Sequence, residues 1–266
     1  MLPVSSIADT LRAAGCVFAE EEAALLVEAA GSPGQLDAMV RQRSGGLPLE
    51  HLLGWVEFCG ARMVIEPGVF VPRRRTEFLV RQAARFAEGL GRPPVVVDLC
   101  CGSGAIGAAL SDALPLCEIH AADIDPAAVA CARRNIEPRG GHVFQGDLFD
   151  PLPRALLGHV DVLLVNAPYV PTNAIGMMPP EARLHEPMKA LDGGPDGLDV
   201  QRRVVQDSAK WLTPGGAIFV ETSPRQSRET GRIMARAGLV PKVFRDAGLD
   251  ATVVLGVSPA SSQPVS

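Results

Sequence analysis

The segment that most constrains the fold spans residues 95–107 and reads Val-Val-Val-Asp-Leu-Cys-Cys-Gly-Ser-Gly-Ala-Ile-Gly. An apolar run of strand length ends at Leu99, a glycine-rich turn follows, and a helical pattern begins at Gly104. Glycines let a backbone approach a ligand closely, and the N-terminus of a helix offers unpaired N–H groups. The segment therefore predicts a strand, a turn and a helix, with a ligand site at the carboxyl end of the strand.

Strand and helix patterns alternate from Pro93 onward, which is typical of a parallel α/β sheet. We expect further strands at residues 118–123, 142–147, 160–166, 216–222, 241–245 and 251–257, helices at residues 104–113, 126–136 and 197–212, and a polar helix ending near residue 238. A dinucleotide-binding domain usually ends with a sixth parallel strand, whereas two closing strands fit a seven-stranded methyltransferase sheet better. The predicted fold class is α/β, with a Rossmann-like seven-stranded domain.

The N-terminal part of the chain has a different pattern. Apolar residues repeat at three- and four-residue steps over residues 7–43, and Gly31-Ser32-Pro33-Gly34 separates two helices. Residues 54–71 are typical of short strands around turns, with Glu66-Pro67-Gly68 as the turn. We therefore predict a small helical domain with a hairpin connector (residues 1–71), a methyltransferase-type domain (residues 72–258) and a flexible tail (residues 259–266).

Composition excludes several classes of protein. Of the 266 residues, 47% are hydrophobic, which excludes a mainly disordered chain. A net charge of −5 disfavours a protein that binds long stretches of nucleic-acid backbone. The six cysteines include no C-x-x-C pair and the five histidines are scattered, so we expect no metal site and reduced thiols in the cytoplasm. We also expect no signal peptide and no membrane span, because the longest apolar stretch is short and interrupted.

The glycine-rich turn alone leaves the cofactor open. Residues 102–107 satisfy G-x-G-x-x-G, a pattern that serves nicotinamide and flavin cofactors and also fits S-adenosylmethionine. Asp98 favours S-adenosylmethionine, because a carboxylate repels a pyrophosphate and attracts a sulfonium and an ammonium. Asp123, at the end of the next predicted strand, can accept hydrogen bonds from both ribose hydroxyls, whereas Asp125 is better placed as a helix cap. A packing turn without a ligand is the remaining alternative.

The loop after the third predicted strand reads Gly146-Asp147-Leu148-Phe149. In this architecture the loop borders an adenine ring. Asp147 can accept a hydrogen bond from the exocyclic amine, and Leu148 and Phe149 can cover the ring. A solvated loop aspartate is an equally good interpretation.

Residues Asn166-Ala167-Pro168-Tyr169 follow the fourth predicted strand, and Tyr169 is the single tyrosine of the chain. The tetrapeptide resembles the Asn-Pro-Pro-Tyr motif of methyltransferases that modify a planar amide or amine nitrogen. The lone pair of such a nitrogen is delocalised, so a site must hold its hydrogens with acceptors while the lone pair faces the methyl group. The Asn166 side-chain carbonyl and the Ala167 backbone carbonyl are two acceptors, and Tyr169 can stack on a flat substrate. A strand-ending turn with a buried tyrosine is the alternative.

Three further segments extend this resemblance over nearly the whole chain. Residues 43–54 resemble the linker of HemK-type release-factor glutamine methyltransferases, residues 71–77 resemble the Ile-Pro-Arg-Pro-Asp-Thr-Glu loop of that family, and residues 186–198 resemble its Glu-Pro…Ala-Leu…Gly-Gly…Asp-Gly-Leu segment. The resemblance implies an N-terminal helical domain that helps to recognise a protein substrate and an S-adenosylmethionine-dependent methyltransferase domain. The implied reaction methylates the side-chain amide nitrogen of the glutamine in the Gly-Gly-Gln motif of peptide-chain release factors.

The resemblance also implies roles for individual residues. The acceptor site takes Asn166, Ala167, Pro168 and Tyr169, and the cofactor site takes Asp98, Cys100, Gly102, Ser103, Gly104, Asp123, Ile124, Asp147, Leu148 and Asn166. The implied partner is a release factor, with no membrane and no nucleic-acid substrate. The chain departs from the family pattern at Cys100 (usually glycine), at Arg74 and Arg75 (proline and aspartate) and at Ala167 (proline).

These departures leave alternatives open. A paralogue could methylate another protein glutamine, a small-molecule amine or a nucleic-acid base. A nicotinamide-dependent oxidoreductase would use the glycine-rich turn but leaves Asn166 and Tyr169 unexplained, and a silent cofactor-binding module leaves Asn166 unexplained. The Arg73–Arg75 run fits a solvated loop better than a contact with an acidic or RNA-bound partner.

Overall fold

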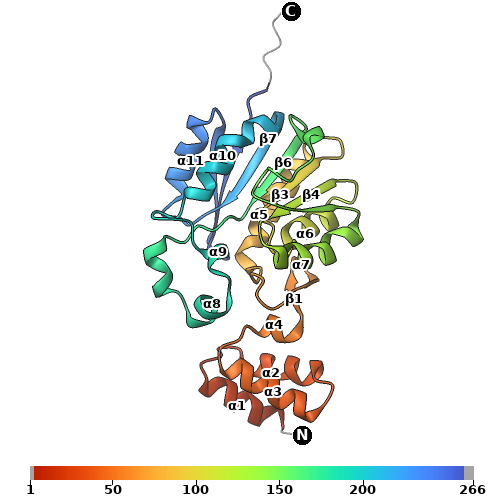
Figure 1. Cartoon of the computed structure of the whole chain (residues 1–266), viewed down its shortest axis with the longest axis vertical. Helices are drawn as coiled ribbons and strands as arrows, with labels where there is room; N and C mark the ends of the chain where they lie inside the picture. Colours follow the sequence, from red (N-terminus) through yellow and green to blue (C-terminus); the bar gives the residue numbers. More distant parts are fainter. Residues whose placement is uncertain (1–2, 261–266) are drawn as a thin grey trace, which may run out of the picture.

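The computed structural model describes residues 3–260 and contains a seven-stranded sheet in the order β5-β4-β3-β6-β7-β9-β8 (Figure 1). The strands are β3 (Val95–Leu99), β4 (Glu118–Asp123), β5 (His142–Gln145), β6 (Val160–Val165), β7 (Leu212–Glu221), β8 (Val240–Asp246) and β9 (Ala251–Val257). Strands β3 to β7 run parallel, and β9 is antiparallel to both of its neighbours. The predicted α/β sheet with two closing strands is confirmed.

Helices cover both faces of the sheet, since its strands carry apolar side chains on both faces. The helices are α5 (Glu77–Glu88), α6 (Ala105–Ala113), α7 (Pro126–Ile136), α10 (Asp199–Trp211) and α11 (Ser227–Arg236). Val96 belongs to the core beneath α5, α6 and α7, and its neighbour Val97 belongs to the core beneath α10 and α11. The alternation along one strand therefore builds two hydrophobic layers.

The order of the strands fixes where a ligand can bind. The chain runs outward from β3 through β4 to β5, then returns to the other side of β3 and continues through β6 to β7. The direction of winding therefore reverses between β3 and β6. In open parallel sheets, ligands bind beyond the carboxyl ends of the strands at such a reversal.

Four helices at the N-terminus form a separate core. They are α1 (Val4–Ala13), α2 (Ala19–Ala29), α3 (Pro33–Ser44) and α4 (Leu49–Leu53). Their buried side chains, such as Ile7, Leu11 and Leu26, pack against one another. The predicted break at residues 31–34 is confirmed, because the Ser32 hydroxyl accepts a hydrogen bond from the backbone N–H of Gln35 and caps α3.

A hairpin of β1 (Trp55–Phe58) and β2 (Ala61–Val64) connects the helices to the sheet. The turn predicted at residues 66–68 forms, with the backbone N–H of Val69 donating to the carbonyl oxygen of Glu66, but it is not the turn of the hairpin. The chain turns at Cys59 and Gly60, both with positive φ, as tight hairpins require, and residues 67–68 form a separate later turn. Apolar side chains of the hairpin belong to the same core as α5, α6 and α7. The hairpin therefore packs as part of the sheet domain, whereas the four helices have their own core.

The connection from β6 to α10 carries most of the irregular structure. It contains η4 (Thr172–Met177), α8 (Pro180–His185) and α9 (Met188–Leu191), and shorter 3₁₀ turns lie elsewhere at η1 (Arg74–Thr76), η2 (Glu137–Arg139) and η3 (Arg154–Leu156). None of the described helices has the length and apolar character needed to span a membrane. Within residues 3–260, no group of three or more His, Cys, Asp or Glu residues could hold a metal ion. Of the predicted tail, residues 261–266 lie outside the described residues.

Candidate active site

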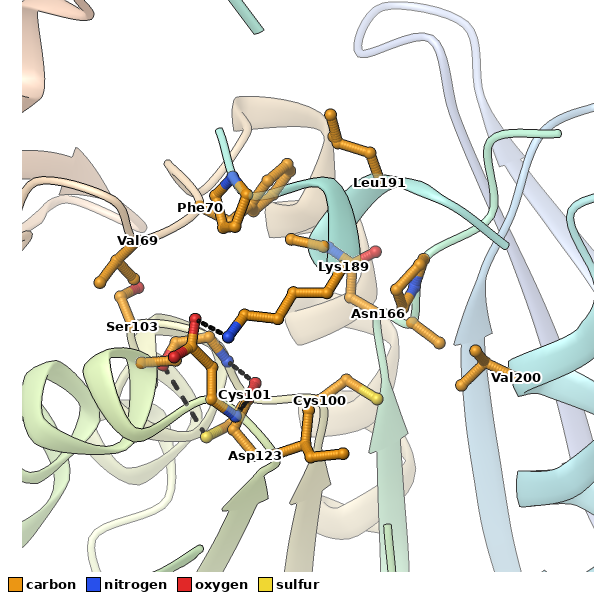
Figure 2. Close-up of a pocket in the computed structure, with 18 of the residues that line it drawn as sticks. Val69, Phe70, Cys100, Cys101, Ser103, Asp123, Asn166, Lys189, Leu191 and Val200 are labelled. Atoms are coloured by element: carbon orange, nitrogen blue, oxygen red, sulfur yellow. Dashed lines mark hydrogen bonds and ion pairs between the residues drawn. The ribbon is translucent and has the colours of Figure 1, made fainter. Parts of the chain in front are cut away.

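A cleft opens at the carboxyl ends of β3, β4 and β6, where the strand order reverses (Figure 2). Among the predicted site residues, those that line it are Cys100, Gly102, Ser103, Asp123, Ile124, Asp147, Leu148, Asn166, Ala167, Pro168 and Tyr169. Asp98 and Gly104 are the two predicted residues that do not line it. The structure therefore brings together residues that are up to 69 positions apart in the sequence, from Cys100 to Tyr169.

The glycine-rich turn forms one wall of the cleft. Cys100 has a φ of 56°, a left-handed conformation that costs a non-glycine residue about 1 kcal/mol. Gly104 has a φ of 74°, and a Cβ there would lie 2.8 Å from Cδ1 of Ile136. Gly104 therefore lets α6 pack closely on α7, which places the N-terminus of α6 toward the cleft without a direct contact from Gly104 itself.

Asp98 lies beneath this turn and is fully buried. Its Oδ2 accepts a hydrogen bond from the backbone N–H of Gly107 at 2.9 Å. Burial raises the pKa of this carboxyl to about 7. Among the described residues its Oδ1 has no hydrogen-bond partner. Asp98 thus holds the start of α6, the helix that follows the turn, and its expected contact with a cofactor cation stays a prediction.

Asp123 stands at the tip of β4 beside the turn. Its Oδ2 accepts a hydrogen bond from the backbone N–H of Gly102 at 2.9 Å, and its Oδ1 accepts one from that of Asp125 at 2.8 Å. Each carboxylate oxygen keeps a second lone pair, so the group can still accept from a diol. Burial raises the pKa of Asp123. Asp125 caps α7 by accepting from the N–H of Ala127 at 3.0 Å, as predicted.

The loop after β5 contributes Asp147 and Leu148 to the cleft. Oδ2 of Asp147 lies 2.5 Å from Nη2 of Arg203 on α10, so this carboxylate is paired as well as partly exposed. The prediction that Phe149 covers a ligand ring is wrong. Phe149 is buried and stacks on Trp211, with ring centroids 5.2 Å apart. Leu148 has a φ of 50°, which turns the chain so that the next side chain enters the core.

Asn166 and Ala167 line the cleft, and each carries an oxygen acceptor that has no partner among the described residues. Asn166 is half-buried, and its side-chain amide has no hydrogen-bond partner among the described residues. No donor of residues 3–260 lies within hydrogen-bond distance of the Ala167 carbonyl oxygen. Both groups follow directly after β6, a fully buried strand that fixes their position. Two acceptors in this position can hold the two hydrogens of an amide or amine nitrogen.

The phenol of Tyr169 closes this end of the cleft. Its hydroxyl accepts a hydrogen bond from Nη2 of Arg75 at 2.9 Å and donates one to Oε1 of Glu221 at 3.2 Å. Glu221 ends β7 and keeps 3% of its surface exposed. Sequence reasoning missed Glu221, although the rule that selected Asp123, an acid at the carboxyl end of a predicted strand, also applies to it. Arg75 is exposed, as expected for a solvated loop, but it also lines the cleft and contacts Tyr169 and Glu221.

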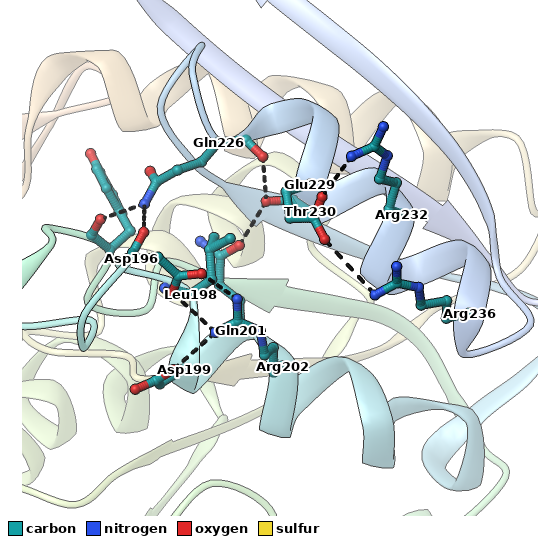
Figure 3. Close-up of polar contacts among 11 residues, drawn as sticks. Asp196, Leu198, Asp199, Gln201, Arg202, Gln226, Glu229, Thr230, Arg232 and Arg236 are labelled. Carbon is teal, nitrogen blue, oxygen red and sulfur yellow. Dashed lines mark hydrogen bonds and ion pairs between the residues drawn. The ribbon is translucent and has the colours of Figure 1, made fainter.

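A second layer of contacts fixes the backbone at Tyr169, and the contact of Gln226 with Asp196 in this layer can be followed in Figure 3. Nε2 of Gln226 donates to the carbonyl oxygens of Tyr169 at 2.9 Å and of Asp196 at 3.0 Å. A Cβ on Gly197, where φ is 76°, would lie 2.3 Å from the Tyr169 carbonyl oxygen. A Cβ on Gly193 would likewise lie 2.6 Å from the Pro168 carbonyl oxygen, so glycine is needed at 193 and 197 because this loop lies directly on the backbone of the acceptor segment.

Ion pairs attach the β6–α10 connection to the rim of the cleft. Glu186, whose side chain is buried, accepts from Arg73 at 2.5 Å. Lys189 extends across the cleft (Figure 2), and its Nζ lies 2.9 Å from Oδ2 of Asp125. These pairs were not predicted, because the partners are far apart in the sequence. They make this connection one wall of the site.

The cleft therefore offers two kinds of chemistry side by side. Near β4 it offers the carboxylate of Asp123 with apolar walls from Ile124 and Leu148. Near β6 it offers two oxygen acceptors beside an aromatic ring. Such a site can hold a ligand with a diol and a flat ring next to a planar nitrogen.

Comparisons with known proteins agree with this arrangement. A family model described as a methyltransferase small domain matches residues 62–194. The chain is 38% identical over 202 residues to the release factor glutamine methyltransferase of Geobacter sulfurreducens, a match that covers 75% of this chain and 69% of the relative. It is 36% identical over 204 residues to a 4-amino-L-phenylalanine/4-methylamino-L-phenylalanine methyltransferase of Streptomyces pristinaespiralis, covering 73% of this chain and 69% of the relative.

The fold also resembles a solved structure. A Thermus thermophilus 16S rRNA N2 G1207 methyltransferase, solved in complex with AdoMet and guanosine, superposes with a TM-score of 0.55 at 20% identity. The match covers 77% of this chain and 49% of that one, and it supports the fold. The motif-bearing cleft, the family model and the identity to the Geobacter relative together show that this chain belongs to the release factor glutamine methyltransferase family.

Proposed function

We propose that this chain transfers a methyl group from S-adenosylmethionine to the side-chain amide nitrogen of the glutamine in the Gly-Gly-Gln motif of a peptide-chain release factor. The observation that carries the proposal is the pair of unpartnered acceptors, the Asn166 side chain and the Ala167 carbonyl, beside the ring of Tyr169. The family membership and the similarity to the release factor glutamine methyltransferase of Geobacter sulfurreducens support the substrate.

The acceptor residues would act by orientation. An amide nitrogen shares its lone pair with the carbonyl, so it attacks only when its two hydrogens are held and its lone pair is aimed. Asn166 Oδ1 and the Ala167 carbonyl would each accept one hydrogen, and the Tyr169 ring would lie against the flat amide. Alignment of this kind lowers a barrier by several kcal/mol, and the nitrogen loses its proton after transfer.

The cofactor residues fit S-adenosylmethionine, which supplies a methyl group on a sulfonium. Asp123 would accept from the ribose hydroxyls through the lone pairs that Gly102 and Asp125 leave free. Ile124, with 59% of its surface exposed, and Leu148 would cover the adenine, and Asp147 would border its amine. Asp98 does not line the cleft, and its Oδ1 has no hydrogen-bond partner among the described residues, so it would favour the positively charged end of the cofactor by its charge from behind the turn.

We further propose that the helices α1 to α4 recognise the protein substrate. They have their own core, and Arg43 on α3 lies 3.1 Å from Glu181 on α8, in the connection that forms one wall of the cleft. A protein bound across the helices would therefore also contact the rim of the acceptor site. A release factor is large enough to make both contacts, whereas a free amino acid is not.

A second candidate is methylation of an aromatic amine on a free amino acid. The relative from Streptomyces pristinaespiralis has nearly the same identity as the release-factor enzymes, and Ala167 replaces the first proline of the family tetrapeptide. The same two acceptors could hold an aniline nitrogen. Arg75 also places a guanidinium at the cleft.

Labelled methyl transfer separates the two candidates. The protein is incubated with S-adenosylmethionine labelled on the methyl group and with a purified release factor, and mass spectrometry locates the label. A release factor whose Gly-Gly-Gln glutamine is changed to alanine serves as the control, and 4-amino-L-phenylalanine is the rival acceptor. We expect label on the Gly-Gly-Gln peptide of the natural factor alone. Label on the free amino acid and none on the factor would establish the second candidate instead.

A further inference from the structure

Three side chains from separate elements meet at the acceptor end of the cleft. Arg75 comes from η1, Tyr169 follows β6, and Glu221 ends β7. Nη2 of Arg75 donates to the Tyr169 hydroxyl at 2.9 Å, that hydroxyl donates to Oε1 of Glu221 at 3.2 Å, and Nε of Arg75 lies 3.5 Å from the same Oε1. The arrangement is a closed triangle with the phenol oxygen at one corner.

The hydrogen-bonding capacity of this phenol is largely used within the protein. Its one O–H is directed at Glu221, and one of its lone pairs faces Arg75. The pKa of Tyr169 is raised, first by burial and then by the charge of Glu221, so the hydroxyl keeps its proton at neutral pH. The phenol is therefore poorly suited to act as a base or to hold a substrate hydrogen, and its ring is the part left to contact an acceptor.

We propose that Arg75 and Glu221 are positioning residues that lock the ring of Tyr169 against the acceptor nitrogen. A phenol held by one hydrogen bond can still turn about it, whereas bonds from two directions fix the plane of the ring. The Glu221 side chain is buried, with 3% of its surface exposed, and Arg75 keeps 43% of its side chain exposed. The proposal rests on the proposed function, because it places the acceptor against this ring.

The contact of residue 75 with the phenol depends on an arginine that the family loop does not carry. Residue 75 is an arginine where the resembled family loop carries an aspartate, and an aspartate cannot donate to the phenol oxygen at neutral pH. The neighbouring Arg74 is exposed and forms no hydrogen bond or ion pair with any residue of the described chain. Arg74 therefore provides a matched control, with the same chemistry one position away.

A double-mutant cycle on the full chain tests the mechanism. We expect R75M to lower kcat on the release factor about tenfold and Y169F to lower it at least as much, with KM for S-adenosylmethionine within about twofold, because both variants lose the bond between Arg75 and the phenol and Y169F also loses the bond to Glu221. The double variant should lose no more than Y169F alone, R75K should recover part of the rate, and R74M should match the wild type. Additive losses, or an R75M variant with wild-type kcat, would overturn the proposal.

A second readout needs no acceptor. Tyr169 is the single tyrosine of the chain, so phenolate absorbance in a pH titration reports this residue alone. Arg75 and Glu221 are the charged groups in contact with it, and they shift its pKa in opposite directions. We expect E221Q to lower the pKa, R75M to raise it, and R74M to leave it unchanged.

The two experiments separate the possible failures. If the wild-type protein transfers no methyl group to the release factor, the proposed function fails. The titration still decides whether Arg75, Tyr169 and Glu221 are in contact in solution. A Tyr169 pKa that is the same in E221Q, R75M and wild type would overturn the positioning proposal, whatever the acceptor is.

Discussion

Replacing Gly197 with alanine should damage both stability and catalysis. A Cβ there would lie 2.3 Å from the Tyr169 carbonyl oxygen and 2.4 Å from Nε2 of Gln226, so something must move by roughly 0.7 Å to reach an allowed contact. The left-handed φ of 76° adds about 1 kcal/mol for an alanine. Loss of the two hydrogen bonds donated by Gln226 adds about 1 kcal/mol each, so we expect about 3 kcal/mol in total.

Gly158→Ala is the matched control. Gly158 also has a positive φ, of 73°, but a Cβ there would have nothing within 4 Å, and the residue lies outside the cleft. It should therefore lose only the conformational part, about 1 kcal/mol. Both variants gain the same reduction in unfolded-chain entropy, so the difference between them isolates the contact with the acceptor segment.

Urea unfolding and steady-state kinetics measure the two effects. We expect Gly197→Ala to be about 2 kcal/mol less stable than Gly158→Ala, and its kcat to fall by as much as about a hundredfold, because displacement of the Tyr169 backbone moves the acceptor-holding groups. Gly158→Ala should keep the wild-type kcat. Equal losses of stability and equal kcat values in the two variants would refute the role of this loop in fixing Tyr169.

Three other substitutions test charges buried in the structure. Asp98→Asn removes a carboxyl whose pKa is raised from 3.8 to about 7, so the folded state holds its proton more tightly than the unfolded chain does. The wild type should therefore lose stability as pH rises from about 4 through 7, and urea unfolding of the variant should show a smaller loss. An equal dependence of stability on pH in both proteins would exclude a protonated Asp98. Arg92→Met leaves the buried Asp161 without its cation, so the free energy of unfolding should fall by about 3 kcal/mol with kcat nearly unchanged. A variant as stable as the wild type would contradict the importance of this ion pair. Arg43→Met leaves Glu22 buried and unpaired, so circular dichroism should show the helices α1 to α4 melting at lower temperature, and an unchanged transition would contradict this.

The sheet could be predicted because its signals are local. Most strands of the sheet contain a short apolar run, and the turn after β3 and the cap of α7 are determined by adjacent residues. The positions of Asp123 and Asn166 follow from one rule, that functional groups gather where parallel strands end. Most of the predicted cleft residues therefore lie where the sequence indicates.

The errors have physical causes that are not local. At the hairpin, Pro67-Gly68 is the stronger turn signal, yet Cys59 adopts a positive φ that its residue type does not favour. Phe149 follows a residue with positive φ, so its side chain points into the core and not into the cleft. Neither conformation can be deduced from residue spacing.

The contacts around Tyr169 depend on the tertiary fold. Arg75 and Glu221 lie 94 and 52 positions from Tyr169, and Gln226 lies 57 positions away. Only the packing of η1, β7 and α11 around β6 brings them together. The arginine run by itself is typical of a solvated loop, and its contact with the phenol becomes visible only once the sheet is assembled.

The central claim is that Asn166 holds the acceptor nitrogen, and that the cofactor contact also expected of this residue adds little to the affinity for S-adenosylmethionine. The direct measurement compares Asn166→Ala with Asn173→Ala, an exposed asparagine outside the cleft lining, by calorimetric binding of S-adenosylmethionine and by methyl transfer to the release factor. We predict that both variants bind the cofactor within about twofold of wild type, and that Asn166→Ala alone loses about a hundredfold in kcat. An Asn166→Ala variant with normal turnover would contradict the account.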